Sequence, residues 1–73
     1  METIESAKKS LEKKIIQIPS VIGIGVILWD GTQFIEVAVK DAQGMVDLSN
    51  MLPDSKWEGY PVKIIIREQN KVI

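Results

Sequence analysis

The sequence predicts a single α+β domain over residues 1–73, in which an N-terminal helix packs on a twisted three-stranded sheet in the order α-β-β-(short α)-β. Apolar residues recur every three or four positions near the start, which is typical of a helix. Two alternating segments then flank an Asp-Gly turn, and a third alternating segment begins near residue 61. A chain of 73 residues has room for one hydrophobic core.

Residues 3–18 have the periodicity of an amphipathic helix. One stripe contains its apolar positions, namely Ile4, Ala7, Leu11, Ile15 and Ile18. Glu5 lies near the positive end of the helix dipole, and Lys13 and Lys14 lie near its negative end. Pro19 disfavours helical geometry at the preceding residue, so we expect the helix to end there.

Residues 21–29 and 33–40 are predicted to form a β-hairpin around Asp30 and Gly31. Asp-Gly is favoured in two-residue type I′ turns because both positions need a positive φ angle. This turn fixes the register of the two strands. The expected pairs are Trp29–Thr32, Val26–Ile35, Ile24–Val37 and Ile22–Val39. The last three pairs place six branched aliphatic side chains on the face that the helix covers.

In the second half of the chain, the sequence predicts a turn at 41–44, a short helix at 45–52 that ends before Pro53, and a polar loop at 54–60. A third strand follows at 61–68. Its core-facing positions are Val62, Ile64 and Ile66, and its outward positions are Lys63, Ile65 and Arg67. The connection of about 20 residues is long enough for a crossover that places this strand beside the first strand, in parallel. A plain meander is the alternative.

The composition excludes several classes of site. The chain has no cysteine and no histidine, so neither a Ser-His-Asp nor a Cys-His arrangement can form, and no thiolate or imidazole can bind a metal. The acidic residues are scattered and have the pattern of solvated surface groups. The pair Gly23 and Gly25 lacks the third glycine, the lysine and the following helix of a phosphate-binding loop. We therefore expect no enzyme activity, no cofactor and no metal.

The charge balance and the apolar segments also restrict the partners. Nine basic and ten acidic residues leave a net charge of −1, whereas a nucleic-acid binder normally has a basic excess. The longest apolar stretch, residues 21–29, is much shorter than the roughly 20 residues of a membrane span. The N-terminal segment is charged rather than apolar. These features predict a cytoplasmic protein that binds neither nucleic acid nor membrane.

One helix covers only one face of a sheet, so the other face is the main candidate for function. The candidate interface residues on that face are Gly23, Gly25, Ile27, Trp29, Phe34, Ala38 and Ile65. Exposed apolar patches often mark contact surfaces, and Trp and Phe are enriched at the centres of interfaces. We therefore expect a homo-oligomer or a protein partner. The alternative is that the 41–60 segment folds over this face, with Trp57 or Met51 closing the gap.

Two further hypotheses remain. A small ligand or a peptide could bind between the sheet and the 54–60 loop, with Trp57 and Tyr60 as aromatic contacts. The second strand could also be a sheet edge, guarded only partly by Glu36 and Lys40, to which a peptide or a second copy adds. An enzyme that uses carboxylates alone would need two of these acids to converge in a pocket.

Several short motifs resemble a known family. They are PSVIGIGV at 19–26, IEVAV at 35–39, Leu52-Pro53, and GYPV at 59–62. This series resembles the small α+β accessory region that precedes some trypsin-like peptidase domains of bacteria and archaea. The resemblance covers about 19–66 and implies a domain that binds or positions another molecule. No catalytic residue carries over, and residues 26–28 replace a further glycine of the family pattern.

Overall fold

The computed structural model describes residues 3–67, and the first helix, α1, spans Ile4–Ile15. Its N-cap is Thr3, whose side-chain oxygen accepts a hydrogen bond from the Ser6 backbone N–H at 3.2 Å. Its buried residues are Ile4, Ala7, Leu11 and Ile15, as the periodicity predicts. The helix ends three residues earlier than expected. Residues 16 and 17 form a turn before Pro19, and Ile18 packs against the edge of the core.

Strands β1, Val21–Trp29, and β2, Thr32–Val39, form the expected antiparallel hairpin. Asp30 and Gly31 have φ angles of 53° and 77°, as a type I′ turn requires. The structure confirms three of the predicted pairs, Trp29–Thr32, Val26–Ile35 and Ile24–Val37.

The fourth predicted pair, Ile22–Val39, is wrong. A register shift between Val21 and Gly23 inserts one extra residue into β1, so Val39 pairs with Val21 instead. Val21 packs against the core, whereas Ile22 is 38% exposed. The bulge therefore turns one of the six predicted aliphatic side chains away from the helix.

Helix α2 spans Ala42–Met51, so the predicted turn at 41–44 is in fact its first turn. Asp41 is the N-cap, and its Oδ1 accepts a hydrogen bond from the Gly44 backbone N–H at 3.0 Å. Gly44 lies directly against Ser20 and Val39, where a Cβ atom would come within 2.5 Å of the Ser20 Cβ. The glycine that suggested a turn is needed for close packing of this helix.

The sheet has four strands in the order β1-β2-β4-β3, rather than the three that the sequence predicts. Strand β4 spans Tyr60–Ile66, and the extra strand β3 is the two-residue segment Lys56–Trp57. The crossover through α2 places β4 parallel to β2, so the expected position beside the first strand is wrong. The predicted continuation of this strand to residue 68 lies outside the described residues.

Strand β2 is consequently central, and the expectation that it forms an edge is also wrong. Its residues Ile35, Val37 and Val39 are fully buried, and the parallel register places them opposite Val62, Ile64 and Ile66 of β4. A central strand has neighbours on both sides, which agrees with the complete burial of these three side chains. Within residues 3–67, β1 is the strand of the hairpin that forms an edge of the sheet.

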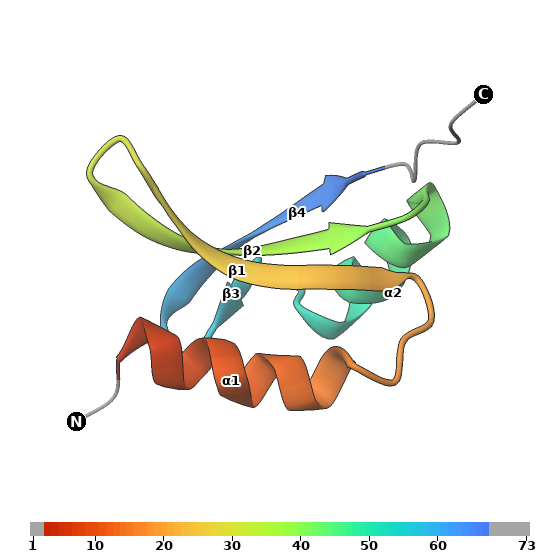
Figure 1. The fold of residues 1–73 in the computed structure, drawn as a ribbon, viewed down its shortest axis with the longest axis horizontal. Helices are drawn as coiled ribbons and strands as arrows, with labels where there is room; N and C mark the ends of the chain where they lie inside the picture. Colours follow the sequence, from red (N-terminus) through yellow and green to blue (C-terminus); the bar gives the residue numbers. More distant parts are fainter. Residues whose placement is uncertain (1–2, 68–73) are drawn as a thin grey trace.

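Both helices pack on one face of the sheet, and the core lies between them and the strands (Figure 1). Leu48 and Leu52 contact the same buried cluster as Leu11 of α1. Met51 and Trp57 also pack against this cluster. The 41–60 segment therefore does not fold over the second face, which is the alternative that the sequence left open. The hairpin end curls away from the helices (Figure 1).

Candidate functional site

The sheet face opposite the helices, called here the outer face, contains all seven residues of the predicted interface. Strand β1 contributes Gly23, Gly25, Ile27 and Trp29, β2 contributes Phe34 and Ala38, and β4 contributes Ile65. The register places Ile27 opposite Phe34, and Ala38 between Gly23 and Ile65. Neighbouring strands thus bring together side chains that are far apart in the sequence.

An aromatic pair lies at the hairpin end of the outer face. The ring centroids of Trp29 and Phe34 are 6.1 Å apart, with the planes tilted by 52°. Trp29 is 61% exposed. The Lys63 Nζ atom lies 5.1 Å from the centroid of the Trp29 ring, within the range of a cation–π contact. The sequence placed Lys63 on this face but did not predict its contact with Trp29.

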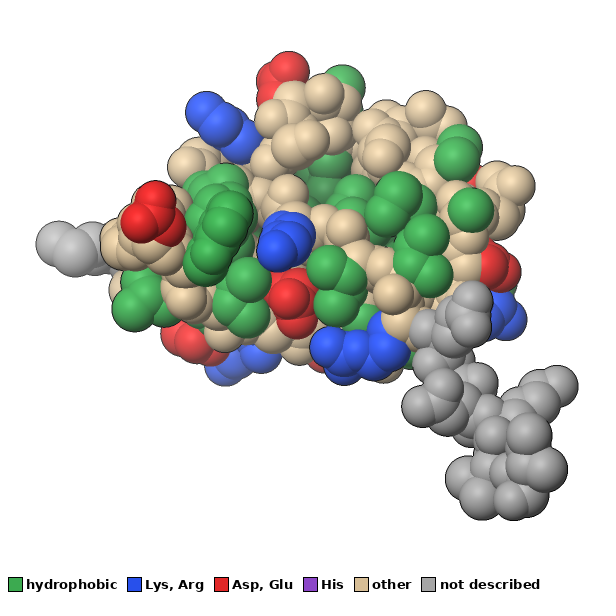
Figure 2. Space-filling view, turned by 90° about the horizontal axis from the view of Figure 1, so that it is seen from above, with side chains coloured by type: hydrophobic (Ala, Val, Ile, Leu, Met, Phe, Trp, Pro, Cys, Tyr) green, Lys and Arg blue, Asp and Glu red, His purple; other side chains and the backbone are tan. Residues whose placement is uncertain are grey.

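Charged residues divide the outer face into two apolar parts. Lys63 lies opposite Glu36 in the parallel register, and Glu36 Oε1 is 4.0 Å from the Arg67 guanidinium. This ion pair is exposed on the arginine side, so it contributes little to stability. Figure 2 looks down on the molecule from above the view of Figure 1 and shows the basic and acidic groups between two groups of hydrophobic side chains.

The second apolar part of the outer face is hollowed. Gly23, Gly25 and Ala38 form the floor of a shallow depression of about 260 Å³, and Glu36 and Arg67 border it. A Cβ atom at either glycine would meet nothing within 4 Å. The glycines therefore leave space for an approaching side chain or backbone.

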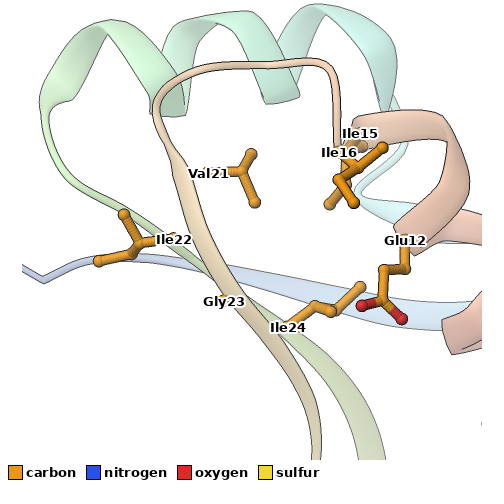
Figure 3. A pocket seen from close by; sticks show the side chains of 7 residues that line it. All are labelled: Glu12, Ile15, Ile16, Val21, Ile22, Gly23 and Ile24. Atoms are coloured by element: carbon orange, nitrogen blue, oxygen red, sulfur yellow. The ribbon is translucent and has the colours of Figure 1, made fainter.

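A second hollow lies on the helix side, along the free edge of β1. Its volume is about 370 Å³, and it is lined by Glu12, Ile15 and Ile16 of α1 and by 21–24 of β1. Figure 3 shows the Glu12 carboxylate beside Ile24, with the two α1 isoleucines above it. Ile16 is 73% exposed, which is unusual for a large apolar side chain beside a hollow. The sequence does not predict this hollow, because Ile16 lies outside the apolar stripe of the helix.

The alternative ligand or peptide site is not assembled as predicted. Trp57 and Tyr60 oppose each other across β3 and β4, and both pack against the core. Neither residue borders the two hollows described above. The Trp57 Nε1 atom is buried and has no hydrogen-bond partner within residues 3–67. Trp57 thus lies at the edge of the core rather than beside a concave site.

The described residues contain no group of three acidic side chains that could bind a metal ion. In the same part of the chain, each helix is too short or too polar to cross a membrane. Comparisons of the chain with protein-family models, with curated proteins and with solved structures found no match.

Proposed function

We propose that this chain is a non-enzymatic interaction module that associates with a second copy of itself through the outer face or the β1 edge. The observation that carries this proposal is the arrangement of both helices on one face of the sheet. The opposite face keeps Trp29 and Ile65 without a covering layer from residues 3–67. Burial of these side chains in a contact would stabilise the assembly.

The composition of the outer face supports a protein partner. Trp29 and Phe34 are large, rigid side chains with few rotatable bonds, and such residues lose little entropy in an interface. Lys63 and the Glu36–Arg67 pair provide charged groups between the two apolar parts of this face. The net charge of −1 favours protein over nucleic acid as the partner. A cytoplasmic location belongs to the same proposal.

The resemblance to a peptidase accessory region agrees with this role, since it implies a domain that positions another molecule. A ligand or peptide site at Trp57 and Tyr60 is less well supported, because both side chains pack against the core.

Sedimentation equilibrium over a wide range of concentration tests the proposal. The expected result is a reversible dimer, whose dissociation constant rises roughly tenfold or more in Trp29→Ser because the contact loses a large apolar side chain. Val46→Ser is the matched control, since Val46 is a 52% exposed apolar residue on α2, away from both surfaces. A wild-type chain that stays monomeric at every concentration would contradict the proposal.

A further inference from the structure

We infer that two copies of the chain pair edge to edge through β1, in antiparallel register about a two-fold axis at Val26. This inference rests on the proposed self-association, and it specifies both the partner, a second copy, and the contact. The pairing would join the two sheets into one continuous sheet with all the helices on the same side.

The free edge of β1 is the first observation behind this pairing. Among residues 3–67, β1 has a neighbour only on its β2 side. The strand has nine residues and contains neither a charged residue nor a proline. Proteins usually protect edge strands with such residues, because an unprotected apolar edge pairs readily with another strand.

The orientation of the backbone groups defines which residues would pair. The Arg67 N–H donates to the Val39 carbonyl at 2.8 Å, so β2 directs the backbone groups of its odd-numbered residues towards β4. The residues opposite 33, 35 and 37 are Leu28, Val26 and Ile24. In an antiparallel ladder these three residues direct their N–H and C=O groups towards the free edge.

Complementary side-chain sizes on the outer face support the position of the axis. An axis at Val26 places Gly25 opposite Ile27 of the second copy, and Gly23 opposite Trp29 of the second copy. The space above both glycines is open, with nothing within 4 Å of a built Cβ atom. Each large side chain of one copy therefore lies beside open space on the other copy.

The helix side has a matching pair of features. Leu28 is 72% exposed and, by strand alternation, lies on the same face as Ile24 and Val26. The axis places Leu28 of one copy opposite Ile24 of the other, and Ile24 lines the hollow beside Ile16. Leu28 would enter this hollow beside the exposed Ile16 side chain.

The position of α1 bears on the pairing. Helix α1 contacts both strands of the hairpin, and β1 more than β2. In the joined sheet the two copies of α1 would therefore be direct neighbours. Adjacent helices pack at about 8–10 Å, so the pairing requires α1 to pack against its copy.

Disulfide trapping tests the register directly. The chain has no cysteine, so Val26→Cys can form only an intermolecular disulfide. Two cysteines opposite each other at the axis would have Cα atoms about 5.5 Å apart, within the range that a disulfide spans. We expect mild oxidation to give a covalent dimer, whereas Gln33→Cys, an exposed site on β2 away from the edge, should form no disulfide-linked dimer under the same treatment.

A charge placed in the proposed contact provides a second test. Leu28→Lys should weaken dimerisation roughly tenfold or more, because it removes a buried apolar side chain and adds a charge. Gln33→Lys adds the same charge at the exposed residue that pairs with Leu28, and should leave the dissociation constant within about twofold, because only small surface effects remain. Circular dichroism checks that both variants are folded.

The outcomes separate this inference from the proposed function. The edge pairing is wrong if the wild-type chain dimerises but two results fail: Leu28→Lys does not change the dissociation constant, and Val26→Cys forms no cross-link. Loss of dimerisation in Ile65→Lys, on the outer face and two strands from the edge, would then assign the contact to that face. A wild-type monomer would overturn both proposals.

Discussion

Gly44 shows how one small residue positions a whole helix. A methyl group there would come within 2.5 Å of the Ser20 Cβ and 2.9 Å of the Val39 Cβ, and neither atom is the end of a flexible side chain. The loop before β1 and the start of α2 can approach each other only because this position lacks a side chain. The Asp41 cap and the small Gly44 residue together fix where the crossover leaves β2.

Gly44→Ala is therefore expected to destabilise the protein. Alanine gains about 1 kcal/mol of helix propensity over glycine, but overpacking costs about 1–3 kcal/mol, so the net loss should be up to about 2 kcal/mol. Urea unfolding of the two proteins measures the difference. Ser49→Ala is the control, because Ser49 is exposed on the same helix and nothing opposes the gain in propensity. A higher stability of Gly44→Ala, like that expected for Ser49→Ala, would contradict the close packing.

The hairpin is the element that the sequence predicts best, because its turn and its hydrophobic alternation agree. Asp30-Gly31 fixes the register, and the structure has the predicted partners from Trp29 back to Ile24. The bulge near Ile22 was not predictable from alternation, since Val21 and Ile22 are both branched aliphatic residues that suit either face. The start of α2 was predictable in principle, because Asp41 is a strong N-cap residue, but Gly44 within its first turn concealed it.

Gly31→Ala tests the hairpin turn. Gly31 has a φ angle of 77°, which is costly for a residue with a Cβ atom, so the substitution should lower the free energy of unfolding by about 1–2 kcal/mol. Thr32→Ala, at the next exposed position, should have a much smaller effect. Thermal denaturation, followed by circular dichroism, compares the stability of the two variants. Equal stabilities would show that the turn does not need a glycine.

At the scale of the whole molecule, the sequence predicted the three long strands but not their order in the sheet. The connection between β2 and β4 is long enough to reach either side of the hairpin, so its length alone does not select a neighbour. The sequence of β2 does not select a neighbour either, because Ile35, Val37 and Val39 alternate with Glu36 and Ala38 as in any strand with one buried face. The structure places the seven residues of the candidate face on one side of the sheet, and their role as an interface stays a prediction, whereas the free edge was assigned to the wrong strand.

The position of β1 at the edge of the sheet leaves one long strand with an unpaired side for a second copy. Hydrogen exchange by NMR, measured at low and at high protein concentration, tests it most directly. In dilute solution, the amides of Ile24, Val26 and Leu28 should exchange faster than those of Gly25 and Ile27, whose groups point towards β2.

At high concentration, the same three amides should become protected as the edges pair. Equal exchange rates along β1 in dilute solution would show that the edge is already covered. Exchange that does not slow for these amides as the concentration rises would show that β1 does not form the contact.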